Sequence, residues 1–267
     1  MGFTNDRNTR GYVVVEKLFY LDEDYAGIFI KNGLDTFEAV WNAEADIVDN
    51  PNLSRGGHSD VGILRLSGED GNEQCFYLKR QVNHNCRRIS NPFRGVPLAI
   101  REWENIQKLR KIGIQTMDVA CVGHVLNREA RGLLVTEALS RYKAIGEWLS
   151  QVTDPQQRQN IMRALGRLVG LMHLEGIKHG CFYPKHVFIS DSDPLNIRLI
   201  DLEKAKPSFS KKGGLRDLDT FFRRTSQLVP EDKEHFMEAY LEAGPMSSMS
   251  PSSKKRVASQ MMAVGYI

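Results

Sequence analysis

The sequence has no long hydrophobic run: none of its apolar stretches approaches the roughly 20 residues that a membrane span requires. The opening stretch, MGFTNDRNTR, is polar and lacks the apolar segment of a secretory signal peptide. The four cysteines are scattered, and the absence of a C-x-x-C pair argues against a zinc site or a dithiol redox motif. We therefore expect a cytoplasmic protein with free thiols.

The sequence also lacks a strong charge imbalance, internal repeats and long low-complexity segments. A formal net charge of +3 is too small to indicate nucleic-acid binding, and we expect no such partner. Hydrophobic residues make up 41% and charged residues 26%, which is typical of a soluble globular protein. A chain of 267 residues is long enough for one large domain or for two smaller lobes.

The first half of the chain has the patterns of strands. VGILRL and CFYLKR, joined by the turn-rich stretch SGEDGNEQ, predict a hairpin. PLAIREWENIQKLRKIG predicts a helix that opens at Pro97 and closes at Gly113. RGLLVTEAL then predicts a buried strand.

The second half is mainly helical in pattern. A long helix is predicted from its N-cap, Asp154, to its stop signal, Gly176. The stretches HVFIS and IRLID predict short strands on either side of a turn, and the remainder is predicted to be helical. This order favours a two-lobed α+β fold over a doubly wound sheet.

Lys79 closes the apolar strand CFYLK. Its ordinary interpretation is a side chain that extends to solvent, and the alternative is the phosphate-contacting lysine of a kinase. Such a lysine needs an acidic partner on the following helix. At about 100° per residue, Glu102 lies about 40° from Ile106 on the apolar stripe, whereas Glu104 lies about 160° away and should face solvent. Because a buried carboxylate is costly unless paired, we predict an ion pair between Lys79 and Glu102.

Two further features are compatible with nucleotide and metal binding. Gly56 and Gly57 lie in the turn SRGGHSDVG, where backbone amides can approach phosphates, although the spacing is not G-x-G-x-x-G. Asp201 ends the strand IRLID, where an aspartate is either a turn former or a magnesium ligand.

The stretch HGCFYPKH is the most informative motif. Against the kinase pattern H-R-D-L-x-x-x-N, it places His179 at the leading histidine, Cys181 at the catalytic aspartate and His186 at the metal-binding asparagine. A lone histidine is more often structural than functional. A neutral imidazole can nevertheless bind magnesium, although oxygen ligands suit that ion better.

Cys181 leaves the identity of a general base open. A thiol beside Lys185 could ionise, and Glu203 or Asp219 could supply a carboxylate from elsewhere. A positioned base contributes roughly 10²–10⁴ in rate, whereas phosphoryl transfer depends mostly on positioning and charge stabilisation. The motif therefore allows a slow enzyme as well as an inactive one.

HGCFYPKH followed by IDLEKAK, with YLKR and REWENIQKLRKIGI upstream, resembles the lipopolysaccharide kinase (Kdo/WaaP) family, and within it the InaA-like branch. The resemblance extends from about Asn50 to Arg224. It implies a protein-kinase-like fold that uses ATP and Mg²⁺ to phosphorylate a sugar of the lipopolysaccharide core. It also implies that Asp217 braces the catalytic loop and that Glu137 and Leu139 belong to the nucleotide site.

Together these features predict a bilobal protein-kinase-like fold with ATP and magnesium in the cleft between the lobes. The predicted parts are a flexible N-terminus at 1–10, a β-rich N-lobe with one helix at 11–139, a helical C-lobe at 140–243, and a linker with a short helix at 244–267. Two functions remain open: a kinase acting on lipopolysaccharide core or a related phosphorylated glycolipid, and a pseudokinase that serves as a nucleotide-binding or scaffold module in envelope or acid-stress signalling.

One segment is unusually basic. No acidic residue occurs between Glu73 and Glu102, and six basic residues do: Lys79, Arg80, Arg87, Arg88, Arg94 and Arg101. The segment is either a solvated loop or a surface for phosphorylated lipid or the anionic inner membrane. Near such a surface each basic residue contributes about 1 kcal/mol. We expect peripheral contact with the inner membrane through Arg80, Arg87, Arg88 and Arg94.

Overall fold

The computed structural model describes residues 16–48, 52–54, 57–68, 71–88, 91–208 and 214–245. Contacts divide the chain into two compact units, Met1–Glu104 with Met117–Ala138 and Asn105–Thr116 with Leu139–Ile267. The sequence places the boundary after residue 139 and keeps residues 105–116 in the first part. The structure groups 105–116 with the second unit, so helix α3 (Leu98–Lys111) contributes residues to both.

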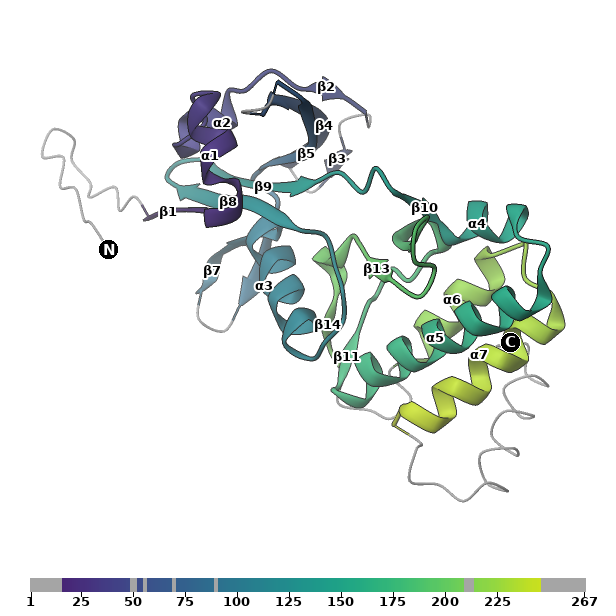
Figure 1. Ribbon diagram of the computed structural model, residues 1–267. Helices are drawn as coiled ribbons and strands as arrows, with labels where there is room; N and C mark the ends of the chain where they lie inside the picture. Colours follow the sequence, from purple (N-terminus) through teal and green to yellow (C-terminus); the bar gives the residue numbers. More distant parts are fainter. Residues whose placement is uncertain are drawn as a thin grey trace, which may run out of the picture. The chain divides into compact units, whose positions relative to one another are not determined.

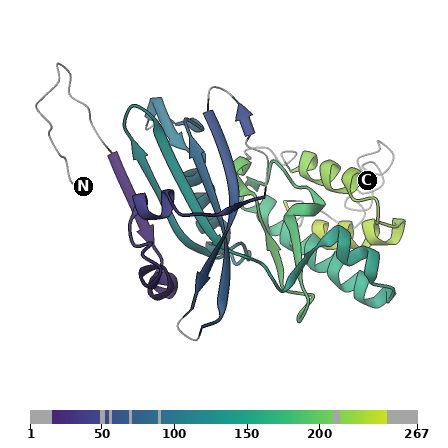
Figure 2. The same ribbon diagram turned by 90° about the horizontal axis from the view of Figure 1, so that it is seen from above.

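The first unit is built on an antiparallel sheet of seven strands (Figures 1 and 2). Its order is β1-β8-β9-β5-β4-β2, and β3 also pairs with β4. The strands are β1 (Glu16–Leu21), β2 (Asp46–Ile47), β3 (Asn52–Ser54), β4 (Gly57–Ser67), β5 (Glu73–Val82), β8 (Val119–Leu126) and β9 (Ala130–Glu137). The predicted hairpin is confirmed as β4 and β5, in which Val61 pairs with Lys79. The pairing places Lys79 on a central strand.

Two helices that the sequence analysis did not predict pack on one face of this sheet. They are α1 (Glu23–Lys31), capped by Asp22, and α2 (Phe37–Trp41), capped by Thr36. Phe29 and Phe37 are fully buried with Phe76 and other apolar residues of the sheet. The expectation of a single helix in this part of the chain was therefore wrong: both helices are short and begin at ordinary capping residues.

Helix α3 packs on the opposite face. Successive side chains of a strand point to opposite faces, so Lys79 and Gln81 of β5 face away from α1. The side-chain oxygen of Gln81 accepts a hydrogen bond from the backbone N–H of Ala99, 2.7 Å away, near the start of α3. Strands β6 (Asn85–Arg88) and β7 (Asn91–Pro97) form a separate hairpin just before this helix. The helix thus begins one residue after Pro97 and is fixed to β5 at its first turn.

The second unit is mostly helical, with two small sheets (Figure 1). Its helices are α4 (Ile145–Gln151), α5 (Pro155–Leu174), α6 (Leu215–Arg224) and α7 (Pro230–Ala243), with single turns η1 (Pro184–His186) and η2 (Leu202–Lys204). One sheet joins β10 (Tyr142–Ala144), β12 (Val187–Ser190) and β13 (Ile197–Leu199), and the other joins β11 (Ile177–Lys178) and β14 (Lys206–Pro207). The predicted long helix is confirmed as α5, whose N-cap Asp154 accepts a hydrogen bond from Gln156 N–H at 2.9 Å.

Helices α5 and α7 pack in close contact. A Cβ at Gly170 would lie 3.0 Å from the carbonyl oxygen of Tyr240 and from the nitrogen of Gly244, so glycine at this position brings α7 near the backbone of α5. Among the described helices, none has the length and apolar character needed to cross a membrane.

Candidate functional site

The first unit contains the predicted ion pair of Lys79 and Glu102. The Nζ atom of Lys79 lies 2.8 Å from Oε2 of Glu102, and the side chain of Glu102 is only 4% exposed. The phase of the helix is the reason, because it turns Glu102 towards β5. Glu104 was expected to face solvent, but it is half-buried.

The carboxylate of Glu137, at the end of β9, already has two partners. Its Oε2 accepts a hydrogen bond from the hydroxyl of Tyr25 at 2.7 Å, and its Oε1 accepts one from the side-chain amide of Gln74 at 2.8 Å. The side chain of Glu137 thus ties α1 to the sheet. Leu139, two residues on, is half-buried, and its carbonyl accepts from Tyr142 N–H at 3.1 Å.

The structure describes only one of the two predicted phosphate-loop glycines. Gly56 lies outside the described residues. Gly57 begins β4 and pairs with Ser54, and a Cβ there would lie 2.5 Å from the carbonyl oxygen of Val82. The close approach of two strands therefore accounts for glycine at position 57 without a phosphate.

The second unit holds the loop HGCFYPKH, and Asp217 of α6 fixes its backbone. The carboxylate of Asp217 accepts hydrogen bonds from the N–H groups of His179 and Gly180, at 2.7 and 2.9 Å. Burial alone would raise the pKa of Asp217, but the hydrogen bond from His173 and the neighbouring histidines hold it below its usual value. An ionised, buried Asp217 therefore bridges α6 and the loop.

His179 connects the loop to the strand that precedes Asp201. Burial lowers the pKa of His179 to about 4, so the imidazole is neutral. Its Nε2 lies 3.0 Å from the carbonyl oxygen of Ile200 and must donate to it, while Nδ1 accepts from the N–H of Cys181 at 3.3 Å. The role of this histidine is to orient the two segments.

His186 and Asp201, the two predicted metal ligands, lie close together. The carbonyl of Cys181 can only accept, so Nδ1 of His186, 2.8 Å away, carries the proton. The Nε2 atom then faces Oδ2 of Asp201 at 3.3 Å. Burial lowers the pKa of His186 and so disfavours the imidazolium. An imidazolium would otherwise donate to both the Cys181 carbonyl and the Asp201 carboxylate. Two acceptors facing each other in this way fit a bound cation.

The backbone around Asp201 is held in an unusual conformation. Asp201 has φ of 57° and ψ of 56°, a left-handed conformation that residues other than glycine rarely adopt. The side-chain amide of Asn105, on α3, donates to the carbonyls of Leu202 and Ala205, both at 2.9 Å, and so supports the turn that follows. Strain of this kind concentrates at functional sites.

The described residues contain no group of three or more His, Cys, Asp and Glu side chains that could hold a metal ion. A preformed zinc-type site is therefore absent from this part of the chain. Two protein ligands suffice for magnesium, which usually keeps several waters and binds substrate phosphates.

The cation that interacts with Cys181 is Lys204. The charge of Lys204 acts to lower the pKa of the Cys181 thiol, whereas Lys185, the partner expected from the sequence, is exposed on η1. Burial nevertheless raises the pKa of Cys181, so the thiol stays protonated at neutral pH. Asp219, considered above as a substitute base, is paired with Arg223 at 3.1 Å.

Lys204 and Asn105 belong to this site as well, and the sequence did not predict either of them. Lys204 lies in the stretch IDLEKAK, three residues after Asp201, and only the folded chain brings it to Cys181. Asn105 had a usable signal in the sequence, because it follows Glu102 by three residues and so lies on the same side of α3. The structure shows that it is buried.

Gly180 occupies the position of the arginine in H-R-D, and the structure gives the reason. Its φ is +79°, and a Cβ would lie 2.6 Å from the carbonyl oxygen of Lys204. We expect Gly180→Ala to destabilise the protein by about 1–3 kcal/mol more than Gly113→Ala, because overpacking costs that much beyond the shared backbone strain. Gly113 is the matched control, with φ of +82° and no atom within 4 Å of a Cβ. Equal losses in urea unfolding would contradict the close contact with Lys204.

Of the four arginines expected to contact the membrane, Arg80 is the one whose side chain the structure describes. Arg80 is directed inwards: its guanidinium donates to Asp60 at 3.0 Å and to the carbonyls of Trp41 and Ala43, both at 3.2 Å. It is therefore a structural residue of the first unit. The side chains of Arg87, Arg88 and Arg94 lie outside those that the structure describes.

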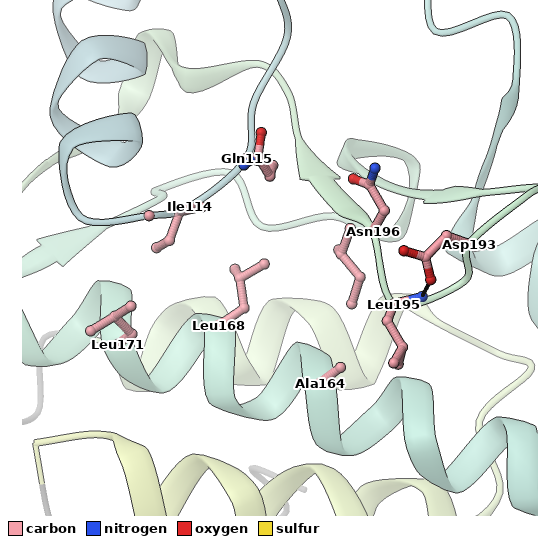
Figure 3. Close-up of a pocket in the computed structure, with 10 residues that line it drawn as sticks. Ile114, Gln115, Ala164, Leu168, Leu171, Asp193, Leu195 and Asn196 are labelled. Atoms are coloured by element: carbon pink, nitrogen blue, oxygen red, sulfur yellow. Dashed lines mark hydrogen bonds between the residues drawn. The ribbon is translucent and has the colours of Figure 1, made fainter.

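A hollow of about 470 Å³ lies elsewhere in the second unit (Figure 3). It is lined by Gly113, Ile114, Gln115, Ala164, Leu168, Leu171, Asp193, Leu195, Asn196 and Ile197. Figure 3 shows the side chains of α5 on one side and the turn that carries Asp193, Leu195 and Asn196 on another. The lining contains none of the predicted site residues, so the loop and its partners, and not this hollow, define the candidate site.

Comparison with known proteins gives consistent matches. The sequence model of the lipopolysaccharide kinase (Kdo/WaaP) family matches residues 38–240. Protein InaA of Escherichia coli K12 is 29% identical over 177 residues, which are 64% of this chain and 79% of that protein. Lipopolysaccharide core heptose(I) kinases WaaP also match. The Pseudomonas aeruginosa protein is 25% identical over 229 residues (78% of this chain, 81% of that protein), and an Escherichia coli one is 27% identical over 179 residues (61% and 66%).

Proposed function

Because the chain belongs to the lipopolysaccharide kinase (Kdo/WaaP) family, we propose that it transfers a phosphoryl group from ATP to a sugar hydroxyl of the lipopolysaccharide inner core or of a related envelope glycolipid. The proposal includes a protein-kinase-like bilobal fold. Support comes from a strand-rich first unit that carries Lys79 and Glu102 and a helical second unit that carries the loop.

The pair formed by His186 and Asp201 is the observation that carries this proposal. Its two acceptor atoms, 3.3 Å apart, suit a divalent cation that also binds the phosphates of ATP. When bound, magnesium would neutralise charge on the phosphoryl group. Asp217 and His179 would hold the loop in place, so that Cys181 and Lys204 lie next to the acceptor hydroxyl.

Lys79 is proposed to contact the phosphates of the nucleotide, with Glu102 fixing the direction of its side chain. Glu137 and Leu139 would contribute to nucleotide binding through their backbone, since the carboxylate of Glu137 is engaged by Tyr25 and Gln74.

We expect Mg-ATP to raise the melting temperature of the native protein and to lose most of this effect in Lys79→Met, because the phosphate contact is gone. Lys79→Met removes the charge that pairs with the buried Glu102, so a double variant, Lys79→Met with Glu102→Gln, serves to remove both charges. Thermal-shift titration provides the measurement. Mg-ATP well above about 1 mM that fails to stabilise the native protein would contradict nucleotide binding.

Glu104→Gln is the matched control for Glu102→Gln, since the two acids lie on one helix. Glu102→Gln should weaken the Mg-ATP shift, and Glu104→Gln should change it little. Equal effects of the two substitutions would contradict a specific role for the pair of Lys79 and Glu102.

Cys181 favours a second function, that of a pseudokinase. Its thiol is buried and protonated, and a thiol is a weak acceptor for orienting a sugar hydroxyl. In that case the protein would bind nucleotide or a signalling partner without efficient transfer. An ADP-release assay with core oligosaccharide distinguishes the two functions, because only the kinase releases ADP in an acceptor-dependent manner.

A further inference from the structure

Tyr240 of α7 is a buried polar side chain that has no part in the proposed function. Its side chain is fully enclosed, with 1% of the residue exposed. Its hydroxyl lies 3.0 Å from Nδ1 of His173, which is on the neighbouring helix α5. Burial raises the pKa of the Tyr240 phenol, so the hydroxyl keeps its proton and can donate. The contact joins the last described helix to α5.

His173 also contacts Asp217. Its Nε2 lies 3.3 Å from Oδ2 of Asp217, and both side chains are almost fully buried. Glycine at position 214, just before α6, leaves room for the imidazole, because a Cβ there would overlap the ring. The position of the His173 ring is therefore fixed from three sides, by Tyr240, Asp217 and Gly214.

With a neutral His173 imidazole, Asp217 fixes the donors and acceptors of these hydrogen bonds. An ionised Asp217 can only accept, so Nε2 of His173 carries the proton. A neutral imidazole then has a lone pair on Nδ1, which needs a donor in a buried site, and the Tyr240 hydroxyl supplies it. The same Asp217 carboxylate holds the backbone N–H groups of His179 and Gly180.

We propose that Tyr240 is a positioning residue for the loop of residues 179–181. Its hydroxyl fixes the tautomer and orientation of His173, and His173 in turn fixes the Asp217 carboxylate that holds the loop backbone. The catalytic consequence rests on the proposed function, since it concerns phosphoryl transfer. The structural consequence, the order of the loop backbone, does not depend on any activity.

The first test is amide hydrogen exchange at His179 and Gly180, followed residue by residue. Tyr240→Phe removes the hydroxyl alone and should speed exchange at these two amides about tenfold, the scale of one lost buried hydrogen bond. The control is Thr225→Val, which removes another buried hydroxyl, one that donates to Phe221 O at 2.6 Å. It should leave both amides unchanged. Faster exchange throughout α5 and α7, without a larger change at the two loop amides, would overturn the proposal.

Two substitutions of His173 separate its hydrogen bond with Tyr240 from its hydrogen bond with Asp217. Gln at this position can place a donor near the site of Nε2, and Asn can place an acceptor near the site of Nδ1. His173→Gln should therefore keep the loop amides better protected than His173→Asn. The opposite order would overturn the assignment of donors and acceptors, and Tyr240→Phe still decides the proposal if either His173 variant fails to fold.

The second test is turnover of the full chain. Tyr240→Phe should lower kcat about tenfold, the effect expected of one buried hydrogen bond, and leave KM for ATP unchanged. A raised KM with unchanged kcat would overturn the positioning role. If the native protein transfers no phosphate, the proposed function fails on that result alone, and the exchange measurement still decides the role of Tyr240.

Discussion

Replacing Cys181 with aspartate is expected to raise the rate of phosphoryl transfer, by up to about 10²–10⁴-fold, the contribution of a positioned general base. The contacts that would position such a base are present. Asp217 holds the backbone on the N-terminal side of position 181, and His186 donates to the carbonyl of Cys181 itself. Lys204, whose charge acts on the Cys181 thiol, would keep the new carboxylate ionised.

The control for this experiment is Cys181→Asn, which has the shape of aspartate without its basicity. A coupled ADP-release assay with a core-oligosaccharide acceptor measures the native protein and both variants. Cys181→Ala adds a further distinction, since it should cost little if the thiol is passive. If Cys181→Asp is no faster than Cys181→Asn while both bind Mg-ATP, the expectation that only the base is missing is refuted.

Replacing Asp201 with asparagine should reduce transfer by at least about 10²–10³-fold, because charge stabilisation of the phosphoryl group is the largest contribution to this reaction. Asp201 is the carboxylate that faces Nε2 of His186, and its left-handed backbone sets the direction of the side chain. Loss of its charge should also remove the dependence of nucleotide binding on magnesium.

Asp219→Asn is a suitable comparison, because its carboxylate is on α6 and is paired with Arg223. Turnover and the magnesium dependence of the Mg-ATP thermal shift are both measured. Equal losses in the two variants, or a magnesium dependence that survives in Asp201→Asn, would show that the metal is held by other residues.

Local sequence signals were sufficient for some of these features. The hairpin of β4 and β5 follows from turn residues between two apolar strands, and α5 follows from its cap at Asp154 and its stop at Gly176. The partner of Lys79 followed from helical phase, because burial makes one face of α3 apolar and leaves Glu102 on it. In each case the determining physics acts within a few residues or along one helix.

Other features depend on contacts between distant parts of the chain. Tyr240 and His173 are 67 residues apart in sequence, and neither motif nor periodicity links them. Lys204 reaches Cys181 only after β13 and the following turn bring the two segments together. Helices α1 and α2 were missed for a different reason: they are short, and they lie in a part of the chain where short apolar runs alternate with turn residues in a pattern that also suits strands.

The most direct test of the account is single-turnover transfer from Mg-ATP to purified lipopolysaccharide core oligosaccharide by the native protein, with the acceptor analysed by mass spectrometry. The account predicts slow, magnesium-dependent phosphorylation of a core sugar, lost in Asp201→Asn and accelerated in Cys181→Asp. Binding of Mg-ATP by all three proteins, with no phosphate on the acceptor in any of them, would contradict the kinase and leave the pseudokinase.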